Sequence, residues 1–380
     1  MPTPAPRPQS YSSRLLKGTL LTPGGWVRGS LEFSDRISAV HGGPVAAPGA
    51  NQPIILPGFL DLHVHGGGGA DVMDGGEAID TLARLHARHG TTALLATTLT
   101  APRAALEQAL GPVRARVHER APGAARVLGV HLEGPFINPR RRGAQPDATR
   151  PGTLEEVRAL DAVAHVRVVT LAPELPGHLG LVRALADHGM RVQIGHTQAS
   201  YDQAVAALEA GARGFTHLFN AMTGTDHRAP GAPAAALAHA EHAEIIADLT
   251  HVHAGALRAA LRAIPRLYAV SDATAAAGMP DGPHRLGGQP VTKAQGVVRL
   301  ADGTLAGSAL TLDQALRNLV SLGVPLDDAA RRVSTHAADY LGLSDRGRIA
   351  RGAFADLAVL SPTLELEAVY VEGEAIALGG

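Results

Sequence analysis

Between residues 57 and 272, short apolar runs alternate with amphipathic segments of helical period. Four of these segments are 77–88, 154–160, 178–188 and 201–210, the last with Ser200 as its N-cap. The apolar runs are predicted β-strands at 59–65, 92–98, 126–133, 165–171, 191–196, 213–217, 243–249 and 267–272. Eight strands alternating with helices predict an α/β fold and favour a closed, TIM-like (β/α)8 barrel. An open doubly wound sheet is the alternative, because strand counts from one sequence are often wrong.

The two ends of the chain follow a different pattern. Residues 14–56 are strand-like runs broken by Gly and Pro turns, and residues 352–371 are strand-like again. We therefore predict that residues 1–56 and 342–380 pair into a small β-sandwich domain, and that residues 57–341 form the barrel domain.

Two segments outside the repeating pattern carry further predictions. The first ten residues contain four prolines and no apolar periodicity, so we expect them to be disordered. After residue 272 we predict a Gly/Pro-rich loop, a strand near 295–300, and helices near 310–322 and 326–341.

Five of the eight predicted strands end in a side chain that can bind a metal ion. These side chains are His63 and His65, Glu133, His196, His217 and Asp272. Imidazole nitrogen and carboxylate oxygen suit a catalytic ion of the zinc type, and barrel enzymes build their sites at strand ends. A single histidine at a strand end is usually structural. Five strands with the same feature indicate a metallohydrolase.

Strand geometry separates the ligand candidates further. His63 and His65 are two residues apart, so both point to one face of their strand and can bind one ion together. His131 shares a face with Glu133 but lies one residue pair deeper, so we expect it to support the site rather than bind the ion.

Composition limits the classes of protein and of metal site that this chain can form. Hydrophobic residues make up 45% of the 380 residues and charged residues 18%, which suits a globular protein with a large core. A net charge of −1 gives no general attraction to nucleic acid or anionic membranes. The chain has no cysteine, so any metal must be bound by His, Asp or Glu. We see no signal peptide and no apolar stretch of about 18 residues, and we expect a cytoplasmic protein.

Several motifs, in order, resemble a known family. The motifs are Pro57–His65, His131–Phe136, Gly195–Thr197, Thr216–Met222, Ser271–Thr274 and Thr304–Leu310. The first of them resembles the opening strand of the amidohydrolase superfamily, and the later ones resemble its N-acetylglucosamine-6-phosphate deacetylases over about residues 55–320. The resemblance implies hydrolysis of the acetamide of N-acetyl-D-glucosamine 6-phosphate to glucosamine 6-phosphate and acetate, in amino-sugar catabolism.

The resemblance also implies roles for residues. Glu133, His196 and His217 would bind the main metal ion, and Asp272 would take a proton from water and give it to the leaving amine. Zinc is the first expectation, with iron, manganese or cobalt as alternatives. Arg228 would reach the phosphate from the neighbouring subunit of a homodimer. The implied substrate contacts are Ala144, Gln145, Asn220, Ala221, Arg228, His251, Leu305, Ala306 and Gly307.

The chain departs from the family pattern at three places. Some members carry a Gln-x-Asn pair in place of His63 and His65, and a histidine in place of Gln145; those members bind one ion. One account is that a second ion at His63 and His65, bridged by Glu133, polarises the substrate carbonyl. The other is that this pair stays empty and the Gln145 amide donates to the carbonyl. Thr223 replaces an expected proline, and we have no functional account of it.

Two other functions compete with this prediction. A dihydroorotase-like enzyme acting on a cyclic amide would keep the fold, but the fourth strand lacks the lysine such an enzyme needs. A non-catalytic barrel that senses a sugar phosphate would have no evident need for Asp272 beside the metal.

Overall fold

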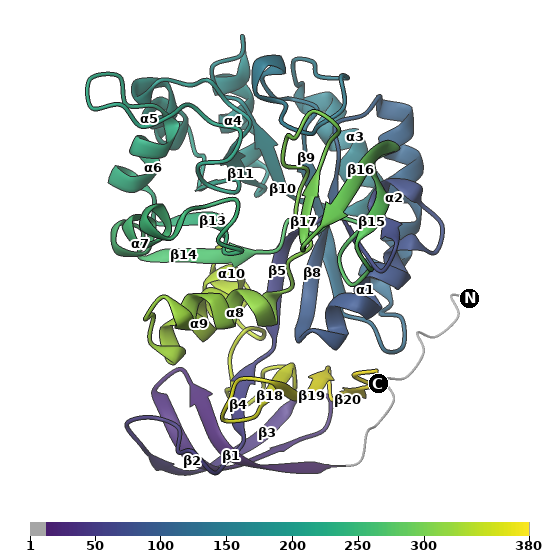
Figure 1. Ribbon diagram of the computed structural model, residues 1–380. Helices are drawn as coiled ribbons and strands as arrows, with labels where there is room; N and C mark the ends of the chain where they lie inside the picture. Colours follow the sequence, from purple (N-terminus) through teal and green to yellow (C-terminus); the bar gives the residue numbers. More distant parts are fainter. Residues whose placement is uncertain (1–12, 380) are drawn as a thin grey trace.

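The computed structural model describes residues 13–379, so the ten N-terminal residues predicted to be disordered lie outside the described residues. All eight predicted barrel strands are present (Figure 1). They are β5 (Phe59–Val64), β8 (Thr91–Thr98), β9 (Arg126–Glu133), β10 (Val166–Leu171), β11 (Arg191–Ile194), β12 (Gly214–Phe215), β13 (His242–Ile246) and β14 (Arg266–Val270).

These strands form a curled parallel sheet of the TIM-barrel type. Six pair in the order β12-β11-β10-β9-β8-β5, and β13 pairs with β14. Backbone hydrogen bonds join the two groups at both ends: Leu218 N–H donates to Glu244 O (2.9 Å), and Asp272 N–H donates to His63 O (2.9 Å). Every residue of β5 and β8 is buried, as expected for strands covered on both faces.

Helices follow most of the strands and cover the outside of the sheet (Figure 1). They are α1 (Ala78–Arg88), α2 (Arg103–His118), α3 (Leu154–Ala164), α4 (His178–Asp187), α5 (Tyr201–Glu209), α6 (Ala232–His239), α7 (Ala254–Ala263), α8 (Leu312–Ser321), α9 (Leu326–Arg332) and α10 (Thr335–Tyr340). The predicted cap of α5 is confirmed, because the Ser200 side chain accepts from Gln203 N–H.

The single helix predicted over 326–341 is wrong, because the chain breaks between α9 and α10. Val333 O accepts from Leu60 N–H of the barrel (2.9 Å). The Ser334 hydroxyl donates to Ala330 O (2.6 Å). These bonds use carbonyls that a continuous helix would pair with its own N–H groups, and Ser334 leaves the helical region at φ −143° and ψ −79°.

The predicted loop after residue 272 is also partly wrong. A three-stranded antiparallel sheet forms from β15 (Gly282–Leu286), β16 (Gln289–Ala294) and β17 (Val297–Arg299). Only β17 was expected. Gly287 and Gly288 both have positive φ (52° and 87°), which is what a two-residue hairpin turn requires.

The two ends of the chain meet in one seven-stranded sheet. Its order is β20-β19-β18-β4-β1-β2-β3, and its purple and yellow strands lie together at the bottom of Figure 1. The strands are β1 (Arg14–Thr22), β2 (Gly25–Phe33), β3 (Ile37–Pro44), β4 (Ile54–Pro57), β18 (Leu357–Leu360), β19 (Leu366–Val371) and β20 (Glu374–Ile376).

Partly buried ion pairs connect this sheet to the barrel. Glu372, just after β19, accepts from Arg126 of β9 at 2.7 and 2.8 Å, and it also pairs with Arg346 and Arg120. Burial alone would raise the pKa of Glu372, but its bond to Arg126 and the charge of Arg346 lower it to about 2.

Candidate metal centre and substrate cavity

The predicted ligands converge at the carboxyl ends of the barrel strands. Glu133 is the last residue of β9, while His196, His217 and Asp272 each lie two residues beyond the end of a strand. These last three adopt positive φ (47°, 29° and 51°). Left-handed backbone costs a non-glycine residue about 1 kcal/mol or more, so the surrounding structure must hold each turn. Sequence patterns do not reveal such turns.

One set of three ligand atoms lies around the Glu133 carboxylate. Glu133 Oε1 is 3.1 Å from His196 Nε2 and 3.0 Å from His217 Nε2, and the two nitrogens are 3.1 Å apart. Two ligand atoms about 2.0–2.1 Å from a tetrahedral zinc ion lie roughly 3.3 Å from each other. The three separations therefore match ligands of a single ion.

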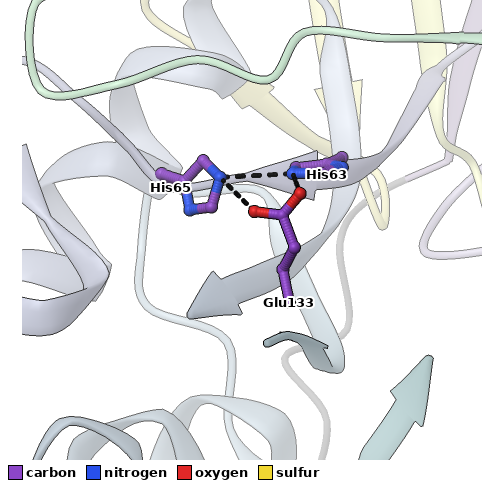
Figure 2. Close-up of side chains that lie close together, drawn as sticks. All are labelled: His63, His65 and Glu133. Atoms are coloured by element: carbon purple, nitrogen blue, oxygen red, sulfur yellow. Dashed lines mark hydrogen bonds and ion pairs between the residues drawn. The ribbon is translucent and has the colours of Figure 1, made fainter. Parts of the chain in front are cut away.

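A second set lies on the other side of the same carboxylate (Figure 2). His63 Nε2 and His65 Nε2 are 3.2 Å apart. His63 Nε2 is 3.4 Å from Glu133 Oε1, and His65 Nε2 is 3.1 Å from Glu133 Oε2. Glu133 thus belongs to both sets, as a bridging carboxylate would.

Three of the four histidine rings, those of His63, His65 and His196, are fixed with their Nε2 lone pairs facing inward. His65 Nδ1 lies 3.2 Å from Thr97 O, and His196 Nδ1 lies 2.8 Å from Arg141 O. Carbonyl oxygens only accept, so each Nδ1 carries the proton, and Nε2 of a neutral ring is an acceptor. His63 Nδ1 faces a carboxylate, Glu244, in the same way (3.0 Å). Paired acceptors about 3 Å apart repel unless a cation lies between them, so these residues fit a divalent metal.

Asp272 and Gln145 complete the rim of the centre. Asp272 Oδ1 lies 3.3 Å from His65 Nε2 and 3.5 Å from His63 Nε2. Gln145 is fixed at both ends of its amide: its Nε2 donates to Glu133 Oε2 (2.5 Å), and its Oε1 accepts from Thr100 N–H (2.7 Å).

His131 lies beneath the candidate ligands, with both ring nitrogens in contact with other groups. Its Nδ1 lies 3.0 Å from Leu62 O and its Nε2 lies 2.7 Å from the Thr170 hydroxyl. Burial lowers the pKa of His131 to about 4, so the ring is neutral and both nitrogens are already engaged.

A cavity of about 370 Å³ opens above the centre, which is large enough for a small ligand. Ala306 is fully buried behind its wall, and Arg228, on an exposed loop, is not part of the lining. The other predicted substrate contacts line it: Ala144, Gln145, Asn220, Ala221, His251, Leu305 and Gly307.

A positively charged side chain that the sequence analysis did not identify also lines the cavity. Arg299, the last residue of β17, lines the cavity with His251. Its Nη1 donates to Gly303 O (2.8 Å). Burial and the charge of Arg299 would lower the pKa of His251, but the Asp248 carboxylate, 2.6 Å from its Nδ1, raises it. Arg299 was missed because β15 and β16, which pair with β17 in one sheet, were taken for a loop.

Thr223, the unexplained departure, has a local structural role. Its hydroxyl donates to Ala199 O (3.3 Å) and accepts from Ala232 N–H (3.0 Å), which fixes the loop before α6.

Comparison with known proteins then decides the family. The profile of the Amidohydrolase family matches residues 54–376. The chain belongs to the amidohydrolase family. This superfamily is metal-dependent, and the strand-end residues of this chain form groups that could hold a metal ion.

Named relatives of this amidohydrolase lie close in sequence and structure. The N-acetylgalactosamine-6-phosphate deacetylase of Escherichia coli O157:H7 is 40% identical over 93% of this chain and 97% of its own length. The N-acetylglucosamine-6-phosphate deacetylase of Vibrio furnissii is 39% identical over 85% of this chain and 82% of its own. A mutant N-acetyl-D-glucosamine-6-phosphate deacetylase from Mycobacterium smegmatis, solved with N-acetyl-D-glucosamine-6-phosphate, superposes with a TM-score of 0.89 at 34% identity, covering 96% of this chain and 100% of that one.

Among the described residues, no helix is long and apolar enough to cross a membrane.

Proposed function

We propose that this amidohydrolase deacetylates N-acetyl-D-glucosamine 6-phosphate, giving D-glucosamine 6-phosphate and acetate. The observation that carries the proposal is the pair of ligand sets sharing Glu133, with Asp272 beside them at the floor of a ligand-sized cavity. The names of the relatives point to the same reaction.

Glu133, His196 and His217 would hold a divalent ion, which would supply Lewis acidity for a water molecule and for the acetamide carbonyl. Asp272 Oδ1 takes a proton from that water as its oxygen attacks the carbonyl carbon. The carbon–nitrogen bond then breaks, and Asp272 returns the proton to the leaving nitrogen. The products are acetate and the free amine.

We propose that the chain would hold two ions, one at Glu133, His196 and His217 and a second at His63 and His65, with Glu133 common to both ligand sets. One amide hydrogen of Gln145 is committed to Glu133, which leaves Gln145 poorly placed as the main donor to the substrate carbonyl. Zinc fits the donor set best, and iron, manganese or cobalt would also fit.

The phosphate is expected to contact cationic side chains that line the cavity. His251, paired with Asp248, and Arg299 lie in the same chain. We propose that Arg228 joins them from the neighbouring subunit of a homodimer, because its exposed loop, residues 223–231, is outside the cavity of its own chain. A guanidinium suits bidentate phosphate contact.

A second candidate substrate is N-acetyl-D-galactosamine 6-phosphate. It is favoured by the Escherichia coli relative, which is 40% identical over 93% of this chain. A cyclic-amide substrate is less favoured, since β10 ends in Thr170 and Leu171 with no lysine.

We also infer that residues 1–56 and 342–380 form a small β-sandwich domain, separate from a (β/α)8 barrel domain over residues 57–341. A separate apolar cluster supports this division. It contains Leu20, Leu31, Phe33, Ile37, Ile55, Ile349, Ala353, Ala355, Leu357 and Val359.

The test is amine release by protein purified without chelator. We expect turnover of N-acetylglucosamine 6-phosphate, with kcat/KM far higher than for unphosphorylated N-acetylglucosamine. A preference for the galacto epimer would select the second candidate. No amine from either sugar phosphate by metal-loaded protein would refute the deacetylase proposal.

A further inference from the structure

A buried carboxylate lies directly beneath the predicted metal ligands. Glu244, in the middle of β13, has no exposed surface. A carboxylate out of contact with water is costly unless hydrogen bonds and a nearby cation compensate for it. Its neighbours along β13, Ala243 and Ile245, are buried apolar residues, so the position is unusual for a glutamate.

Both Glu244 oxygens are hydrogen-bonded, and one contacts two elements of the metal centre. Oε2 lies 3.0 Å from His63 Nδ1 and accepts from the backbone N–H of His217 at 3.3 Å. Oε1 accepts from Gln193 Nε2 at 2.9 Å and from the Tyr268 hydroxyl at 3.5 Å. One carboxylate therefore contacts a ligand residue from each of the two ligand sets.

We propose that Glu244 is a positioning residue that orients His63 and sets the metal affinity of the His63–His65 half of the centre. A carboxylate only accepts, so it keeps the proton of His63 on Nδ1 and leaves the Nε2 lone pair for an ion. Its negative charge also makes the ring a stronger ligand, and partners of this kind are worth 10–100-fold in metal affinity.

A chain of polar side chains keeps Glu244 in place. Gln193, which donates to Glu244, accepts from the Thr216 hydroxyl at 2.8 Å. The Thr216 hydroxyl lies 2.7 Å from the Thr170 hydroxyl, which lies 2.7 Å from His131 Nε2. The carboxylate cannot turn away from His63 without breaking this buried chain.

A metal bound by Glu244 itself is the competing role. His63, His131 and Glu244 do lie close enough to surround an ion. However, His131 uses Nδ1 on Leu62 O and Nε2 on Thr170, so it has no nitrogen to offer. The separation between His131 Nδ1 and Glu244 Oε1 is 3.9 Å, too long for a hydrogen bond.

Glu244→Gln is the informative change because it preserves shape. If the new amide oxygen faces His63 Nδ1, the new NH2 group faces the NH2 group of Gln193, and two donors oppose each other. If the amide turns over, its NH2 faces His63 Nδ1 and forces the proton onto Nε2, which blocks the ion. Either arrangement weakens the half-site. Glu241→Gln is the matched control, since Glu241 is exposed and lies just before the same strand.

The inference rests on the two-ion centre proposed above, and measuring the bound metal distinguishes a failure of the inference from a failure of the two-ion centre. Wild type and Glu241→Gln should hold two equivalents of zinc, and Glu244→Gln about one, with the weaker site 10–100-fold weaker in a chelator competition. In a His63→Asn background, Glu244→Gln should cause no further loss, because its effect passes through His63.

Each outcome has a meaning. Two equivalents bound with wild-type affinity by Glu244→Gln would overturn the positioning role alone. If wild type binds only one equivalent of zinc when zinc is in excess, the two-ion centre and this inference are both overturned. The deacetylase proposal is then still tested separately by the amine-release assay. If Glu244→Gln does not fold, Glu244→Asp is the alternative, because the shorter side chain keeps the negative charge but moves the carboxylate away from His63. This variant should lose the second ion and keep the first. Two ions bound normally by Glu244→Asp would then refute the inference.

Discussion

Asp272→Asn gives the sharpest test of the proton-transfer role. Asp272 is 7% exposed, and its Oδ1 lies 3.3 and 3.5 Å from the inward-facing nitrogens of His65 and His63. Asparagine keeps the shape of the side chain but cannot take up a proton. The left-handed backbone at this residue (φ 51°) is also well tolerated by asparagine.

The expected loss is a fall in kcat of ~10²–10⁴, the usual value of a general acid–base group. That loss corresponds to about 3–5 kcal/mol of activation free energy. KM should change little, because the substrate contacts on the other walls of the cavity are untouched. Losing one weak contact between Asp272 and an ion would lower metal affinity without lowering kcat of the loaded enzyme.

The assay is steady-state amine release with metal content measured on the same samples. Asp187→Asn is the control, because Asp187 is exposed at the end of α4 and away from the cavity. A fully metallated Asp272→Asn enzyme with kcat near wild type would remove Asp272 from proton transfer. A raised KM at unchanged kcat would instead assign it to substrate binding.

Three further outcomes are expected. The double variant His63→Asn/His65→Asn should hold about one metal equivalent, whereas wild type should hold two. If wild type holds only one ion and the double variant is fully active, then His63 and His65 do not bind a catalytic ion. Arg299→Ala should raise KM for the phosphorylated sugar more than for the unphosphorylated one. Arg285→Ala is the control and should not, because Arg285 lies on the same small sheet but its guanidinium donates to Gly288 O. Equal losses on both sugars in Arg299→Ala would argue against phosphate contact. The pKa of Glu372 is lowered to about 2 in the folded protein, against roughly 4.3 in the unfolded chain, so its ion pairs should add about 3 kcal/mol to the free energy of unfolding above pH 4.3. That contribution should be lost as the pH falls toward 2. Urea unfolding of Glu372→Gln should show the contribution missing at pH 7, and a variant with the same pH dependence of stability as wild type would refute it.

The strands and ligands were predictable because each depends on local pattern. Buried parallel strands are short apolar runs, and a polar side chain at the end of such a run is visible in the sequence. His63, His196 and His217 could be found this way, and the structure brings them together with Glu133.

Glu244 and Arg299 could not be found because their roles depend on distant partners. Glu244 meets His63 across 181 positions of sequence, and in the sequence it is one polar residue in an apolar run. Arg299 reaches the cavity only because the hairpin of β15 and β16 positions β17, and that hairpin has exposed, weakly apolar strands. The break between α9 and α10 likewise depends on a bond from Leu60 to Val333 O.

Charge balance gives an independent reason to expect two ions. Glu133, Asp272 and Glu244 are buried carboxylates around one centre, with a combined charge of −3 when ionised. The imidazoles that place an Nδ1 proton on an oxygen acceptor, His63, His65 and His196, are neutral ligands when they bind metal. One divalent ion leaves a net charge of −1 in a low-dielectric site, whereas two leave +1, which suits an anionic substrate and a water that must lose a proton. Removing the charge of Glu244 should therefore disfavour the second ion even before its geometric effect on His63 is counted.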